Sequence, residues 1–168
     1  GLESVDKTNC ILEVTQAEQC FVFEDVAEKP VPSLLRGFSA PVKLEYNYSR
    51  KDLAFIMSCD SDGFCRWDAC QRLAVDIIQE LAIAYRKGEA PKVDRNLLEA
   101  FDSLLSDESL DPAMVALMLT LPSESYLAEI AEQVKVEALF EAREIVRHSI
   151  ATELREVLGR RYVSLETH

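Results

Sequence analysis

Three prolines close together limit what the middle of this chain can be. The stretch PVPSLLRGFSAPVKLEY, residues 30–46, contains Pro30, Pro32 and Pro41. Each proline removes a backbone donor and fixes φ, so the stretch cannot be the interior of a helix. Residues 42, 44 and 46 are apolar or aromatic, and this two-residue period is typical of a half-buried strand. We therefore expect the stretch to end a β part and to lead into an α part.

Two short runs rich in Val, Ile and Phe precede the prolines, at residues 9–15 and 18–26. In the second run, side chains of alternating positions would point to opposite faces of a strand. We expect a hairpin or two neighbours in an antiparallel sheet, with residues 42–46 as a third strand. A sheet of this size is marginal in water. The β part, residues 1–47, is therefore expected to need a partner, either the following helices or strands outside this chain.

Helical patterns fill the remainder, residues 48–168. The predicted helix starts are Ser49 with Asp52 in a capping box, Ser61 or Asp62, Asp94, Asp111 before Pro112, Ser123 or Ser125, and Val136. The second helix is predicted to run from Gly63 to Lys87 and to end at Gly88, and the last from Val136 to Leu158, ending at Gly159. The run AMVALMLTL predicts a short, almost wholly buried helix.

The apolar positions of these helices recur at helical spacing and predict one buried face each. They are Leu53, Ile56 and Met57; Trp67, Cys70, Ala74, Ile77, Ile78, Leu81 and Tyr85; Leu97, Leu98, Phe101, Leu104 and Leu105; Tyr126, Leu127, Ile130 and Val134; and Val136, Leu139, Phe140, Val146, Ile150, Leu154 and Val157. The fold class expected is mainly α with a small N-terminal antiparallel β part, the helices forming an irregular bundle or an array of helix pairs.

Charge and cysteine content narrow the classes of function. The formal net charge is −12, whereas binding to nucleic acid or to an acidic membrane surface needs clustered Lys and Arg. No apolar run approaches the roughly 20 residues of a membrane span. The five cysteines include no CxxC pair, which favours free, reduced, buried thiols in the cytoplasm over disulfides or zinc. Because the chain opens on Gly1 rather than Met, we expect a cut or processed piece.

No motif of a catalytic centre is found in the sequence. HExxH, GxSxG, GxxxxGK[ST] and GxGxxG are all absent. A nucleophilic pair would require Cys59, Cys65 or Cys70 to meet His148, and we expect structural thiols instead. Our prediction is that the chain holds no catalytic, cofactor-binding or metal-binding residue.

Three further groups have a functional and a structural interpretation. Glu137, Glu141, Glu144 and His148 share one side of the last helix, where a solvated face balanced by arginines is favoured over a metal or acid/base cluster. Asp60, Asp62 and Asp68 lack the spacing of a calcium loop, so helix capping is favoured. Trp67 is the single tryptophan and is expected to anchor packing rather than bind a ligand.

Four collinear stretches resemble the aminopeptidase N family, the bacterial-type zinc aminopeptidases of the gluzincin group. They are PVPSLLRGFSAPVKLEYNYSRKDLAFIM, FCRWDACQRLA, LDPAMVALMLTLPS and IATELREVL, and the resemblance extends from about Thr15 to Leu158. It implies the end of a small β-sandwich domain, residues 1–47, followed by the start of a large helical domain, residues 48–168.

The resemblance also implies a function for the longer protein. Members of the family remove N-terminal residues from peptides with a zinc ion held by HExxH and a downstream glutamate, and a GxMEN motif binds the substrate amine. Neither motif occurs here, so no catalytic residue is carried over. The expected role is non-catalytic: packing on the catalytic domain and shaping the access of peptides. The alternative is a stand-alone helical module that binds a protein partner in a groove.

Overall fold

The computed structural model describes residues 4–6, 9–131 and 135–166. The chain forms two compact units, Gly1–Pro30 and Val31–His168.

The first unit contains a short antiparallel pair of strands, β1 (Ser4–Asp6) and β2 (Asn9–Cys10), with Ser4 opposite Cys10. Beyond Cys10 the described residues of this unit form no strand, so the strand predicted over 9–15 is confirmed only at Asn9–Cys10 and the strand predicted over 18–26 is wrong. A strand exists only where a neighbour accepts its backbone hydrogen bonds. Here the side chain of Gln19 takes that place, accepting from the Thr15 amide at 3.0 Å.

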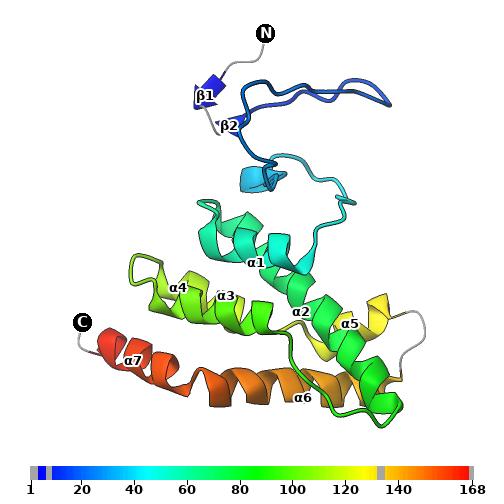
Figure 1. Cartoon of the computed structure of the whole chain (residues 1–168), viewed down its shortest axis with the longest axis vertical. Coiled ribbons are helices and arrows are strands. Elements are labelled where there is room, and N and C mark those ends of the chain that lie inside the picture. The colour runs from blue at the N-terminus through cyan, green and yellow to red at the C-terminus, as the bar shows by residue number, and fades with distance from the viewer. Residues whose placement is uncertain (1–3, 7–8, 132–134, 167–168) are drawn as a thin grey trace. The chain divides into compact units, whose positions relative to one another are not determined.

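The second unit is helical, which confirms the mainly α fold class. Its elements are η1 (Arg36–Phe38), α1 (Arg50–Cys59), α2 (Gly63–Arg86), α3 (Arg95–Ser106), α4 (Pro112–Leu119), α5 (Glu124–Ile130), α6 (Val136–Glu153) and α7 (Arg155–Glu166). Figure 1 shows α6 and α7, orange to red, following each other along the chain. Within this unit α2 packs against α1, α4 and α6, so it forms the centre of the core.

The helix starts follow the capping residues of the sequence. Ser49 and Asp52 form a complete capping box, and the side chains of Asp62, Asp94 and Asp111 accept from backbone amides at the starts of α2, α3 and α4. Ser123, rather than Ser125, caps α5. Gly88, with φ of +72°, follows α2 in the left-handed conformation expected of a residue after a helix.

The predicted apolar faces are buried over most of their length. All five positions predicted for α3 are buried, as are Ala74, Ile77 and Ile78 in the middle of α2. At helix ends the prediction was wrong for Tyr85, Tyr126, Val136 and Phe140, which are exposed. Val134 lies outside the described residues.

Two helices differ from expectation. Helix α4 buries only Val115 and Met118, whereas Leu117 is 50% exposed, because neighbouring elements cover one of its faces. The last helix does not end at Gly159. It breaks at Leu154, with φ of −101° and ψ of 14°, and continues as α7 to Glu166 in a new direction that lets it contact α3.

The strand predicted over residues 42–46 is also absent. Val42 and Tyr46 are exposed, and the carbonyl of Leu44 accepts from the Arg72 side chain at 3.2 Å instead of from a neighbouring strand. This segment is therefore extended over the helices and has no strand partner among the described residues.

Candidate functional site

The most elaborate polar site joins residues 31–48, called here the linker segment, to helices α1 and α2. Val31 at its start and Tyr48 at its end both pack against the helical core. The Tyr48 hydroxyl donates to the Pro32 carbonyl at 2.8 Å, which closes the segment into a loop, and the Arg72 guanidinium lies 5.6 Å from the Tyr48 ring centroid. Burial raises the pKa of Tyr48 to about 12, although Arg72 opposes the shift, so the hydroxyl stays a donor.

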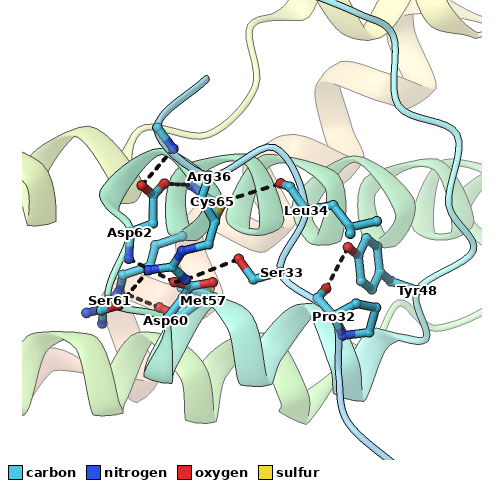
Figure 2. A network of polar contacts seen from close by, with 12 residues as sticks. Pro32, Ser33, Leu34, Arg36, Tyr48, Met57, Asp60, Ser61, Asp62 and Cys65 are labelled. Carbon is cyan, nitrogen blue, oxygen red and sulfur yellow. Dashed lines mark hydrogen bonds and ion pairs between the residues drawn. The ribbon is translucent and has the colours of Figure 1, made fainter. Parts of the chain in front are cut away.

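Arg36 forms the centre of this site (Figure 2). Its guanidinium donates to Asp60 Oδ1 at 2.5 Å and to Ser61 Oγ at 2.6 Å, in the turn between α1 and α2. The Asp60 side chain is only 3% exposed, whereas that of Arg36 is 33% exposed. A buried carboxylate needs a paired charge, so this contact holds the linker segment against the turn.

Asp62 links the same segment to the start of α2. Its Oδ2 accepts from the Gly37 amide at 2.8 Å and its Oδ1 from the Cys65 amide at 2.9 Å. Burial acts to raise the pKa of Asp62, but these hydrogen bonds and Arg36 outweigh it, so the pKa is lowered. Asp62 therefore remains a carboxylate that serves the helix and the segment at once.

The backbone of the segment is strained at this point. Leu35, Gly37 and Phe38 have φ of +59°, +61° and +53°. Glycine adopts this region freely, but a bulky residue with positive φ is unusual and costs about 1–3 kcal/mol. The contacts of Arg36 and Asp62 on either side of the turn offset that cost.

The two buried cysteines have backbone carbonyls as partners. Only Cys65 and Cys70 are buried, so the expectation of five buried thiols is wrong for Cys10, Cys20 and Cys59. The Cys65 and Cys70 thiols donate to the carbonyls of Leu34 and Met118. Burial raises the pKa of Cys65 to about 11 and that of Cys70 to about 12, opposite to the shift that activates a thiol.

The other candidate groups have structural partners. Glu144 accepts from Arg147, whose hydrogen bond lowers the pKa of the carboxyl, and His148 is exposed beside them. The Asp68 carboxylate lies 3.8 Å from the Arg72 guanidinium. The ring centroids of Trp67 and Phe64 are 6.2 Å apart. Residues 4–6, 9–131 and 135–166 contain no group of three or more His, Cys, Asp or Glu that could hold a metal ion.

A second ionic site surrounds Arg50, at the first turn of α1. Its guanidinium pairs with Asp76 at 2.6 Å, with Glu80 and with Asp94 at 3.0 Å, so it joins α1, α2 and the cap of α3. Burial favours the neutral form, but these hydrogen bonds raise the pKa of Arg50 above its usual range. Three of these charges, on Arg50, Glu80 and Asp94, line the adjacent surface cavity of about 460 Å³ together with Lys92 and Arg95, and Arg50 is already paired with the other two.

Two arginines are buried without an ion pair in the described part of the chain. Arg66 donates to the carbonyls of Met57 and Ser58 at 2.8 and 3.0 Å, and so satisfies the last turn of α1. Arg161 donates to the Leu110 carbonyl at 3.0 Å, while its Nε is buried with no partner. Neither contact, nor that of Arg36, could be predicted from the sequence, because the partners are distant along the chain or are backbone carbonyls.

The helices do not include a stretch that could cross a bilayer, within the residues that the structure describes. The ion pairs and hydrogen bonds of the polar sites join elements of this chain to one another.

Two family profiles match the chain. Residues 2–47 match a domain of unknown function, DUF3458, with an Ig-like fold, and residues 50–168 match DUF3458_C, described as ARM repeats. Both descriptions agree with the β-then-α order of the elements, and the ARM description with the packed helices of the second unit.

The individual proteins that this chain is similar to are aminopeptidases. Aminopeptidase N of Escherichia coli K12 is 43% identical over 150 residues, and that of Haemophilus influenzae is 32% identical over 155 residues. These matches cover 89% and 92% of this chain. In the crystal structure of Legionella pneumophila aminopeptidase A in complex with aspartic acid, the matching part has a TM-score of 0.79 and 32% identity, and it covers 100% of this chain.

The relatives are much longer than this chain. It spans 17% of the E. coli protein, 18% of the H. influenzae protein and 20% of the Legionella chain. Because the DUF3458_C profile matches residues 50–168, the chain belongs to the DUF3458_C family. Because it is 43% identical to aminopeptidase N over 150 residues, it is homologous to the corresponding segment of that protein.

Proposed function

We propose that this chain is the non-catalytic part of a zinc-dependent aminopeptidase that removes N-terminal residues from peptides. Residues 1–47 would contribute strands to an Ig-like domain, and residues 48–168 would begin the helical domain that packs on the catalytic domain. The observation that carries this proposal is the 43% identity with aminopeptidase N over 89% of the chain.

Exposed apolar side chains in the first unit support a role inside a longer protein. Ile11, Val14 and Val22 are 73%, 73% and 74% exposed. Ile and Val are among the residues most often buried when a domain folds alone, so their exposure here fits a surface that another part of a longer protein covers. The stand-alone interaction module is therefore the less well supported alternative. The free cysteines agree with a reducing compartment, and we propose a cytoplasmic location.

Zinc does not fit the residues present. The sequence has no HExxH, and the described residues offer no cluster of three ligands. The ligands of the ion would have to come from another part of the polypeptide, and this chain would act by packing and by limiting access to the site.

The first experiment assays the purified 168-residue chain and the polypeptide from the full reading frame with an aminoacyl reporter. We expect hydrolysis that a chelator abolishes from the full-length protein only. Zinc-dependent release of alanine by the 168-residue chain alone would refute the proposal. A reading frame confined to these residues would support the interaction module instead.

The access role needs a separate measurement. In the full-length protein, Arg36→Ala should loosen the linker segment and change kcat/KM for a long peptide more than kcat/KM for a small reporter. Lys43→Ala, at an exposed ion pair, is the matched control. An unchanged ratio of the two constants in Arg36→Ala would argue against a role in access.

A further inference from the structure

A surface of partly exposed apolar side chains crosses the linker segment, α2 and α4. The Phe38 ring meets Phe64 edge-on with centroids 5.3 Å apart, and Trp67 lies one turn further along α2. We call Phe38, Phe64, Trp67, Met114 and Leu117 the turn surface.

Helix α4 extends this surface. The tip of Met114 packs so closely on Gly63 that a Cβ there would lie 2.8 Å from Met114 Cε, next to Phe64 at the start of α2. Leu117 follows Met114 by three residues on the side of α4 away from the buried Val115, and it is 50% exposed. Of the α4 positions that were predicted to be buried, Leu117 is therefore exposed and Met114 is half-buried against the core.

The exposed position of Phe38 requires a strained backbone. Its φ of +53° is strained for an aromatic residue, yet its side chain is 59% exposed, so little burial compensates for the strain. The contacts of Arg36 and Asp62, shown in Figure 2, hold the turn in this conformation. Strain of this kind, fixed by surrounding contacts, is found where a protein presents a residue for recognition.

The turn is not suited to pairing with a strand. The amides of Gly37, Phe38 and Ser39 donate to Asp62 Oδ2, the Leu35 carbonyl and the Arg36 carbonyl. Because these donors are already used, an incoming β-strand would find none of them free, and a partner has to recognise side chains. Aromatic residues and Met are the side chains enriched in the cores of protein interfaces.

We propose that the turn surface docks into an apolar pocket of another domain of the longer polypeptide, with Phe38 as the central anchor. This inference rests on the proposed function. It favours an occupant within the same polypeptide because the matched segment is 17% of the length of the E. coli relative, which leaves other domains to cover this surface. A second copy of the chain is disfavoured, since both copies would carry a net charge of −12.

The test is hydroxyl-radical footprinting of the full-length protein, native and denatured, read at Phe38 by mass spectrometry. An uncovered ring, 59% exposed, would be protected less than about twofold by folding. A ring in an interface core would be protected about tenfold, which is the expected result. Protection of about twofold overturns the proposal, as does protection that appears only on raising the protein concentration, because a second copy would then be the occupant. Phe55, 55% exposed on α1, calibrates the measurement.

A substitution provides an independent measurement. Asn tolerates positive φ, so Phe38→Asn keeps the turn and removes the anchor ring together with its edge-on contact to Phe64. In the full-length protein we expect Phe38→Asn to lower Tm more than Phe55→Asn does, and an equal or smaller decrease counts against docking. Aminopeptidase activity is recorded separately. If Phe38 is protected from hydroxyl radicals but the full-length protein has no aminopeptidase activity, only the proposed function is refuted. If the protein is active but Phe38 is not protected, only the docking is refuted.

Discussion

The ion pair between Arg36 and Asp60 should be the strongest single contact of the linker segment. The carboxylate is 3% exposed and receives one further hydrogen bond, from the Asp62 amide at 2.8 Å. Arg36→Ala removes its only paired charge among the described residues and also the donor to Ser61. The buried carboxylate then keeps its desolvation cost with little compensation.

The expected loss of stability follows from this burial. Removing one partner of a fully buried pair costs about 3–5 kcal/mol. Because Arg36 is 33% exposed and Asp60 keeps the amide bond, we reduce this to about 2 kcal/mol. With an m-value of about 2 kcal/mol/M for a chain of this size in urea, the midpoint should fall by about 1 M.

Urea unfolding followed by the fluorescence of Trp67, the single tryptophan, measures this shift. The exposed pair of Lys43 and Glu45 is the control, and Lys43→Ala should change the free energy by less than about 0.5 kcal/mol. Combining Arg36→Ala with Asp60→Asn should be less costly than the sum of the two single changes, by about 1 kcal/mol. Additive effects, or a loss for Arg36→Ala no larger than that of the control, would refute this reasoning.

Three further predictions concern the buried arginines, the Cys70 thiol and the ion pairs of Arg50. Arg66→Met should cost about 2–3 kcal/mol in urea unfolding because two carbonyls of α1 lose their donors, whereas Arg161→Met, which also removes an unpaired buried nitrogen, should stay within about 1 kcal/mol. Burial raises the pKa of Cys70 to about 12, above the roughly 8.5 of an unfolded thiol, so stability is fully present below pH 8.5 and falls toward pH 12. Cys70→Ala should flatten this decline in Tm between pH 8 and 11, and exposed Cys59→Ala should leave it unchanged. Arg50→Ala should cost about 1–2 kcal/mol at low salt, and less at 1 M NaCl, because three carboxylates lose their common partner; a loss that does not depend on salt would contradict this electrostatic account.

The helix starts could be predicted from the sequence because capping is local chemistry. Ser49, Asp62, Asp94 and Asp111 each lie within three residues of the amide that they accept from. The buried face of α3 was predictable for a similar reason, since helical spacing alone places its leucines together.

Strands and long-range contacts could not be predicted in this way. A run such as residues 18–26 has strand composition, but pairing depends on a neighbour that the run itself does not specify. The turn at Leu35–Phe38 contradicts the backbone preference of two bulky residues, and Arg36 meets a carboxylate 24 positions away. The break at Leu154 depends on the packing of α7 against α3, and no capping residue or proline near Leu154 predicts it.

Most of the linker segment matches the Ig-like family profile by sequence, but its contacts place it in the helical unit. Residues up to 47 match the Ig-like profile, yet Arg36, Gly37 and Leu44 bind α1–α2 elements of the helical unit. A truncation at residue 47 would therefore remove the segment that covers the helices, and would leave the Asp60 carboxylate with the Asp62 amide but without its paired charge. An expression clone of the helical part that begins at Val31 would instead keep every one of these bonds.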